Sequence, residues 1–282
     1  LKNISLDDKY KLENKFILVN GTQALVRATL IQKFRDEKEN LKTAGFVTGY
    51  RGSPVGNVDL QFSKVKKLIS EKDIKFHPGL NEDIAATSLW GSQQAEMRGE
   101  SNYDGVFGFW YGKGPGVDRS GDVFRHSNLA GTSKNGGVIA AMGDDHSGES
   151  STVLFQSEYA FKDAMIPILS PSGVQELIDY SILGWGLSRY AGVWVGLKCL
   201  KDTIDATEVV DGSPDKLKII YPENPVKRGE LSIRVGDTPH AQEERLHRQK
   251  LPAVKKFALE NKIDREGFKK TKLSKIGIIS SG

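Results

Sequence analysis

Two hydrophobic patterns alternate along the first two hundred residues. Short apolar runs have the length and composition of buried strands, and between them apolar residues recur every three or four positions, which predicts amphipathic helices. Val58, Phe62 and Val65 are one such helical series. The patterns predict strands over residues 16–19, 44–48, 74–77, 104–111, 138–142, 166–169 and 193–200, and helices over residues 22–41, 58–72, 82–99, 117–129, 150–161 and 172–190.

This alternation predicts an α/β fold, with a doubly wound, mainly parallel sheet and helices on both of its faces. In such folds ligands bind at the carboxyl ends of the strands, where the crossover connections diverge and leave a crevice. We therefore expect a site along that edge. The segments that follow the predicted strands there are polar and rich in glycine, namely Gly21-Thr22, residues 51–54, Asn81-Glu82, residues 113–119 and residues 144–151.

Beyond Leu200 the composition becomes charged and is punctuated by proline. We expect a possible strand over residues 217–221 and a basic helical pair over residues 238–263, broken at Pro252. This part reads as a mixed C-terminal extension that packs on the sheet domain. The expected division is residues 1–200 for the main domain, 201–270 for the charged extension or linker, and 271–282 for the start of a following domain, so that the chain is a fragment.

Composition excludes several classes of partner and site but identifies none. The net charge is +4, from forty basic and thirty-six acidic residues, which gives no reason to expect nucleic acid or a membrane surface as a partner. A single cysteine, Cys199, excludes an internal disulfide framework or a thiolate cluster for zinc or iron and sulfur. No segment reads as membrane-spanning or as a signal peptide, so a cytoplasmic location is expected.

The glycine-rich run at residues 112–116 has neither the spacing of a phosphate-binding P-loop nor that of the dinucleotide fingerprint. We expect it to form a loop that cannot be helical. Asp144, Asp145 and His146 are residue types that bind metals. The side chains of three consecutive residues after a strand point in different directions, however, so they are not expected to bind one ion together. The sequence therefore predicts no metal site.

Basic side chains after the fourth predicted strand allow two interpretations. Arg119, Arg125 and His126 could hold an anionic substrate, or they could form ordinary ion pairs on an exposed helix face. Their spacing alone favours neither.

A carboxylate lies where a strand, a sharp turn and a helix start meet. Asn81 is a good helix N-cap, and Glu82 follows it in the first turn. Glu82 could simply complement the positive end of the helix dipole. It could equally carry chemistry at the carboxyl edge of the sheet.

Five segments in order resemble the N-terminal domain of the thiamine-diphosphate-dependent 2-oxoacid ferredoxin oxidoreductases, most closely the indolepyruvate ferredoxin oxidoreductase group. The resemblance covers roughly residues 7–270. The segments are Gly21-Thr22-Gln23-Ala24, the Gly-Tyr-Arg-Gly-Ser-Pro run at residues 49–54, Asn81-Glu82, residues 113–122, and Ser150-Ser151 with Gln156.

The resemblance implies a pyrimidine-binding domain. In it, Glu82 is the catalytic glutamate that hydrogen-bonds a ring nitrogen of the aminopyrimidine and favours its imino tautomer. Ser53, Pro54 and Asn81 are expected to contact the cofactor. Arg51, Ser53, Lys113 and Arg119 are expected to bind the substrate, although Arg51 could instead form a salt bridge with a neighbouring domain.

The same resemblance places the rest of the enzyme outside this chain. The diphosphate and magnesium site, commonly marked Gly-Asp-Gly, and the iron-sulfur clusters are expected in other domains. The whole enzyme, expected to be a dimer, would decarboxylate a 2-oxo acid oxidatively, transfer the acyl group to coenzyme A and pass electrons to ferredoxin; the fragment alone is expected to be inactive. Two alternatives remain, a non-catalytic docking or assembly module and a protein that binds a free anion with Lys113, Arg119 and Arg125.

Overall fold

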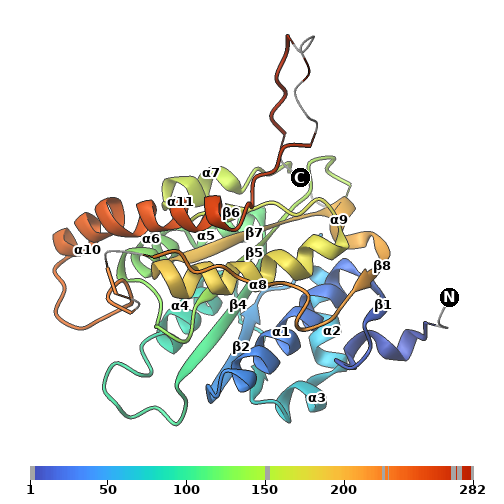
Figure 1. The fold of residues 1–282 in the computed structure, drawn as a ribbon, viewed down its shortest axis with the longest axis horizontal. Coiled ribbons are helices and arrows are strands. Elements are labelled where there is room, and N and C mark those ends of the chain that lie inside the picture. The colour runs from blue at the N-terminus through green and yellow to red at the C-terminus, as the bar shows by residue number, and fades with distance from the viewer. Residues whose placement is uncertain are drawn as a thin grey trace.

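A six-stranded parallel sheet forms the centre of the computed structural model, which describes residues 4–149, 153–223, 226–227, 229–267, 271 and 275–280 (Figure 1). The strand order is β3-β2-β4-β5-β7-β6, and every neighbouring pair is parallel. The predicted α/β fold with a mainly parallel sheet is confirmed. The strands are β2 (Thr43–Gly49), β3 (Ile74–Phe76), β4 (Gly105–Lys113), β5 (Val138–Asp144), β6 (Ile168–Leu169) and β7 (Trp194–Leu200).

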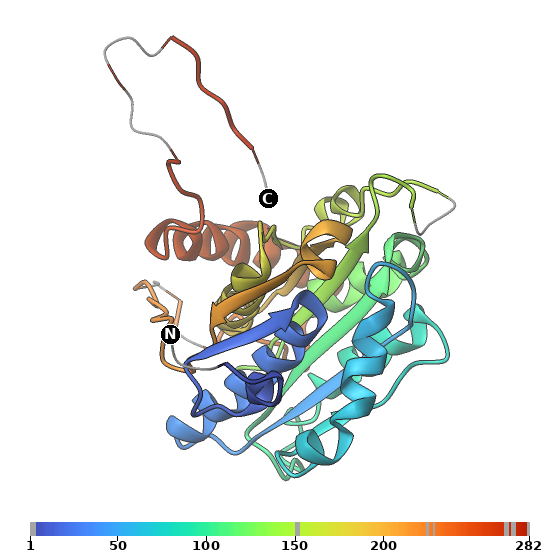
Figure 2. The same cartoon turned by 90° about the vertical axis from the view of Figure 1, so that its right-hand side faces the viewer.

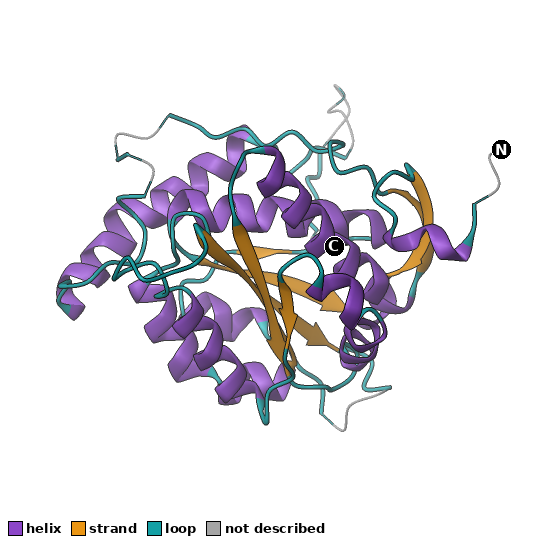
Figure 3. Cartoon of the chain, turned by 90° about the horizontal axis from the view of Figure 1, so that it is seen from below, coloured by secondary structure: helices purple, strands orange, loops and turns teal. Residues whose placement is uncertain are grey.

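Helices cover both faces of this sheet, as Figure 3 shows. Alternate residues of β5 enter two different cores, with Ile139 on one face and Ala140 on the other. The first core takes in α1 (Gly21–Lys38), α2 (Gly56–Lys64), α8 (Val174–Ala191) and α11 (Leu251–Glu260); the second takes in α4 (Glu82–Ser92), α5 (Gly114–Arg119), α6 (Gly121–Ala130) and α7 (Glu158–Asp163).

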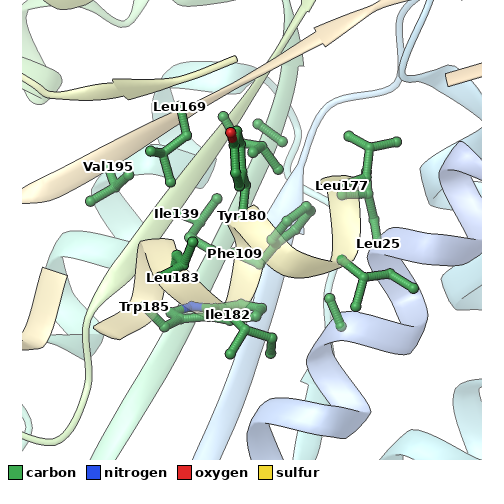
Figure 4. Packing of buried hydrophobic residues seen from close by; sticks show 14 of the residues in the cluster. Leu25, Phe109, Ile139, Leu169, Leu177, Tyr180, Ile182, Leu183, Trp185 and Val195 are labelled. Atoms are coloured by element: carbon green, nitrogen blue, oxygen red, sulfur yellow. The ribbon is translucent and has the colours of Figure 1, made fainter. Parts of the chain in front are cut away.

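The larger core is organised by α8, which packs on the sheet and against α1 (Figure 4). Leu177 lies near Leu25 of α1, and the indole of Trp185 packs near Phe109 of β4. Trp185 Nε1 also donates a hydrogen bond of 2.9 Å to the carbonyl of Gly108. A helix that is buried nearly all round reads as apolar on all sides, which explains why the sequence predicts it so plainly.

The first predicted strand exists but does not join the parallel sheet. β1 (Phe16–Asn20) pairs antiparallel with β8 (Thr207–Asp211) in a separate two-stranded sheet, seen at the right of Figure 1. In β1 Ile17 and Val19 are buried, whereas Phe16 is exposed, as expected for a ribbon that is buried on one face only. The expectation that all the early strands form one sheet is wrong here.

Several predicted helix ends also differ. The helix expected over residues 82–99 ends at Ser92, and the one expected over residues 150–161 is helical only from Glu158 within the described part. α1 begins at Gly21, one residue before the expected start, because the side chain of Asn20 caps it by accepting the hydrogen bond from the Gln23 amide at 2.9 Å. The remaining elements are a 3-10 turn (Leu6–Tyr10), α3 (Lys66–Ser70), α9 (Lys201–Asp205), α10 (Pro239–Arg245) and a π-helical turn (Leu246–Lys250).

In the C-terminal extension, seen in Figures 1 and 2, α11 packs against α8 and α10 packs against α6. Residues 217–221 are not a strand, because the amide of Ile220 is held by Asn261 Oδ1 at 2.8 Å instead of by a neighbouring strand. Pro252 does not break the helical pair: α10, the π-helical turn and α11 follow one another without interruption, and Pro252 lies in the first turn of α11. Within the described ranges, every helix is too short or too polar to cross a membrane.

Candidate functional site

The strand order reverses next to β2, and that reversal creates the candidate site. The chain leaves β2 toward α2 on one face of the sheet, whereas it leaves the adjacent β4 toward α5 on the other face. Connections that part in this way open a crevice at the carboxyl ends of the strands. Backbone hydrogen bonds fix the ends, from Tyr50 to Tyr111 at 3.0 Å and from Gly79 to Gly49 at 2.8 Å.

Glu82 lies at this edge as the first residue of α4. Asn81 caps the helix by accepting the Ile84 amide at 2.8 Å, and the indole of Trp110 donates to the Glu82 carbonyl at 3.0 Å. These two bonds fix the backbone of Glu82. The residue is only 5% exposed, yet among the described residues no hydrogen bond or ion pair reaches its carboxylate. An enclosed carboxylate without a partner is ready to accept a hydrogen bond from a ligand.

Gly116 in α5 packs directly against the Glu82 side chain. A Cβ atom at position 116 would lie 2.3 Å from Glu82 Cγ and 2.6 Å from its Oε1. Only glycine leaves room for the carboxylate in this position. Sequence reasoning missed this role, and the available signal was the glycine-rich run itself.

The run at residues 112–116 is not a loop, which corrects the sequence prediction. β4 extends to Lys113, and Gly114 begins α5 with Pro115 in its first turn. Proline is favoured in the first turn of a helix. Glycine is required at position 114 because a Cβ there would lie 2.4 Å from Phe155 Cβ. Close packing, rather than loop formation, explains these glycines.

The segment after β2 adjoins the ends of β4 and β5. A Cβ on Gly52 would lie 2.7 Å from the Cδ of Lys113, and one on Gly143 would lie 3.1 Å from the Cδ of Pro54. Pro54 is buried and Ser53 is half-buried between them. The structure thus brings the predicted residues Ser53, Pro54 and Lys113 to the same edge as Glu82.

Three basic side chains at this edge have no acidic partner. Arg51 and Arg119 are exposed, Lys113 is half-buried, and none of the three forms an ion pair with any residue that the structure describes. Arg125, by contrast, pairs with Asp163, so part of the ion-pair interpretation of this basic series holds. His126 lies 3.5 Å from Asp122 and stacks on Trp90.

The motif at the start of α1 makes different contacts. The Thr22 hydroxyl donates to Asn20 Oδ1 at 2.9 Å, and the Gln23 side chain accepts the Asn20 amide at 3.1 Å. Gly21 packs on the backbone of Thr203 and Ile204. These side chains are engaged in capping their own helix.

Asp144 and His146 do not diverge as the sequence suggests. With Glu158 they form a group whose ligand-type atoms all lie within 4.8 Å of one another. Ser157 donates its amide to Asp144 at 2.9 Å and its hydroxyl at 2.5 Å, and Lys198 donates to Glu158 at 2.9 Å. Burial raises the pKa of Asp144 despite the bonds from Ser157. These bonds anchor the connection after β5; Ser150 and Ser151 lie outside the described residues.

The contact between Gly116 and Glu82 yields a testable prediction. Gly116→Ala is expected to destabilise the domain by about 1–3 kcal/mol, because the added Cβ overpacks the space beside the Glu82 side chain. The measurement is the free energy of unfolding in urea. Gly91→Ala in α4 is the matched control, since a Cβ there meets nothing within 4 Å and should not destabilise the domain. An equal loss of stability in both variants would contradict the packing argument.

Comparison with known proteins agrees with this fold. No protein-family model matches the chain. The chain is 24% identical over 265 residues to the indolepyruvate oxidoreductase subunit IorA of Methanothermobacter marburgensis, covering 93% of this chain and 38% of that protein.

A solved structure is similar along almost the whole chain. It is a 2-oxoglutarate:ferredoxin oxidoreductase from Magnetococcus marinus with 2-oxoglutarate, coenzyme A and succinyl-CoA bound, with a TM-score of 0.63 and 14% identity over 91% of this chain and 47% of that one. The chain thus spans less than half the length of either protein. The resemblance inferred from the motifs is confirmed: in fold, and at low identity in sequence, this chain is similar to a domain of the 2-oxoacid ferredoxin oxidoreductase family.

Proposed function

We propose that this chain is the pyrimidine-binding domain of a thiamine-diphosphate-dependent 2-oxoacid:ferredoxin oxidoreductase, with indolepyruvate as the favoured substrate. The observation that carries the proposal is the enclosed carboxylate of Glu82, which has no partner among the described residues and lies at the switch point of the sheet. The indolepyruvate preference is supported by the name of the relative in Methanothermobacter marburgensis.

The cofactor would supply the electron sink for decarboxylation, and this chain would supply half of its site. Glu82 would hold a proton at its carboxylate oxygen and share it with a ring nitrogen of the pyrimidine. Gly116 keeps that oxygen in place, and Asn81 and Trp110 hold the backbone behind it. Ser53 and Pro54, on the neighbouring connection, would contact the cofactor from the other side of the edge.

The unpaired basic groups would hold the substrate. Within the described residues, Arg51, Lys113 and Arg119 form no ion pair and leave positive charge uncompensated at this edge of the sheet. A 2-oxo acid carries a carboxylate that guanidinium groups bind well. Ser53 would contact the same substrate. No metal ligand is proposed for this chain; the diphosphate, magnesium and iron-sulfur sites belong to other parts of the enzyme, which is proposed to be a cytoplasmic dimer that also uses coenzyme A and ferredoxin.

The domain division is proposed on the same basis. Residues 1–200 form the cofactor domain, 201–270 the extension, and 271–282 the start of the next domain. Residues 275–280 carry no helix or strand, and Ile276, Ile278 and Ile279 among them are exposed, which fits a segment whose packing partner lies outside the chain.

The test uses the full-length enzyme with thiamine diphosphate, magnesium, coenzyme A and a one-electron acceptor, and a panel of aryl, branched and dicarboxylic 2-oxo acids. We expect acceptor reduction and carbon dioxide release that depend on thiamine diphosphate, with indolepyruvate fastest. A different preferred acid would reject the substrate assignment alone. Absence of turnover with every 2-oxo acid would reject the proposed enzyme function.

A docking or assembly module remains the second candidate, because apolar side chains rim the same edge. Leu80 is 85% exposed, and Ile84, Leu154 and Tyr159 are also exposed. A partner domain of an enzyme would cover such residues too, so they do not separate the two functions. Thiamine-dependent turnover would separate the two functions, because a docking module has no catalytic activity.

A further inference from the structure

Four charged residues gather where the C-terminal extension meets the end of α6: Arg234, Asp237, Arg245 and Lys250, here called the basic cluster. Lys250 is 0% exposed and Arg245 is 4% exposed, whereas Arg234 is half exposed at the rim. One carboxylate therefore faces three basic groups, two of which are enclosed. Buried charges are normally paired, so this excess of positive charge needs an explanation.

Two of the three nitrogen atoms of the Arg245 guanidinium have no partner. Nε and Nη1 are buried without a hydrogen bond or an ion pair in the described structure. Nη2 forms an ion pair with Asp237 Oδ2 at 2.5 Å, and the other oxygen of that carboxylate accepts Arg234 Nε at 2.9 Å. Asp237 thus neutralises part of the charge and leaves Nε and Nη1 of Arg245 without a partner among the described residues.

Lys250 is the most deeply buried residue of the basic cluster. The π-helical turn (Leu246–Lys250) directs it inward, where its Nζ lies 3.4 Å from the Leu129 carbonyl at the end of α6, in the space that a side chain at Gly131 would need. π-Helical turns are frequently found at functional sites. Burial, and after it the charge of Arg245, lowers the pKa of Lys250 to about 7, against a smaller opposing effect of Asp237.

Other charges near this end of the domain do not compensate the cluster. Arg189, near the end of α8, is itself a cation and is paired with Asp36. Lys134 and Glu230 on the adjoining loops are exposed, and the last turn of α6 carries no ionisable side chain. The missing negative charge is therefore not supplied by these neighbouring side chains.

We propose that the basic cluster binds an oxyanion group, a phosphate or a carboxylate, of a small ligand. A guanidinium fork matches the paired oxygens of these groups, and Arg234 beside the exposed Val235 and Gly236 provides the entrance. Gly236 has a φ of +89°, and nothing lies within 4 Å of where its Cβ would be, so this segment is open to solvent. The proposal uses none of the groups around Glu82 and stands apart from the proposed enzyme function.

Binding should depend on pH in a defined direction. An anion favours the charged form of Lys250 and raises its pKa, so binding takes up a proton at pH values above about 7. Affinity should therefore fall as the pH rises through 7, by about tenfold between pH 6.5 and pH 8. Sulfate is the suitable tetrahedral probe because its own charge is constant in this range, and acetate is the carboxylate probe.

The experiment is calorimetric titration of the full-length protein with sulfate and with acetate at constant ionic strength, in two buffers of different ionisation enthalpy. We expect one site per chain for at least one probe, with proton uptake at pH 8, and the preferred probe identifies the ligand class. Arg234→Gln, an exposed change, should weaken binding about tenfold or more. Lys250→Met should remove the proton uptake.

Arg248→Gln is the matched control, because Arg248 lies in the same turn but its side chain is 78% exposed and pairs with Glu244. It should bind the probe like the wild type. Failure of both probes to bind, or equal weakening by Arg234→Gln and Arg248→Gln, would overturn the site. Binding without proton uptake would overturn the role of Lys250, and Arg234→Gln decides the site even where Lys250→Met does not fold.

Discussion

Under the proposed function, Glu82→Gln in the full-length protein is expected to lower thiamine-dependent decarboxylation about 10²–10⁴-fold, the usual contribution of a positioned acid or base. The amide keeps the size of the side chain and its contact with Gly116, but it cannot exchange a proton with the pyrimidine. The measurement is the initial rate of acceptor reduction with saturating 2-oxo acid, together with circular dichroism to verify the fold.

Asp83→Asn separates this role from a purely structural one. Asp83 is the other acidic residue in the first turn of α4, so both substitutions remove one charge from the same end of the helix dipole. Each should change stability by less than about 1 kcal/mol. If the two variants lose activity equally, or if Glu82→Gln keeps wild-type turnover, Glu82 only complements the dipole.

Asp36→Ala is expected to destabilise the domain by about 3–5 kcal/mol, because it leaves a buried guanidinium without its partner. Asp36 near the end of α1 accepts Arg189 Nη1 at 2.6 Å and Nη2 at 2.9 Å, and it also accepts the Thr43 hydroxyl at 2.7 Å. The Asp36 carboxylate holds the pKa of Arg189 above its usual value although burial acts to lower it. Urea unfolding followed by the fluorescence of the buried tryptophans measures the loss.

Two controls test this explanation. Lys38→Ala removes a pair with Asp215 in which both side chains are more than half exposed, and it should cost less than about 1 kcal/mol. Asp36→Leu combined with Arg189→Met removes both buried charges and should be less destabilising than Asp36→Ala alone. A double variant as unstable as the sum of its single changes would show that the charges are not coupled.

The position of the candidate site has a simple physical basis. Parallel strands end at one edge, and the connection after β2 passes to one face while that after β4 passes to the other. Glu82 comes from the connection between β3 and β4, and Gly116 comes from the helix that follows β4. Residues 34 positions apart in the chain thus form one contact, which local patterns cannot predict.

Most departures from the sequence predictions involve contacts of this distant kind. Residues 16–19 have the pattern of any short strand, but their partner is β8, nearly two hundred residues later. The glycines at 114 and 116 look like loop formers until Phe155 and Glu82 are seen to occupy the space of their missing side chains. Glu158 likewise lies close to Asp144 and His146 although it belongs to the following helix, α7.

The sequence by itself determined the alternation of strands and helices, the α/β class and the set of polar segments at one edge, because these follow from local periodicity and turn chemistry. It also pointed to Glu82 through the cap at Asn81. The tertiary structure alone decided that the Glu82 carboxylate is enclosed without a partner among the described residues, that Gly116 makes room for it, and that Arg245 and Lys250 share a buried cluster. Burial and pairing are properties of groups brought together from distant parts of the chain, and no local pattern of residues encodes them.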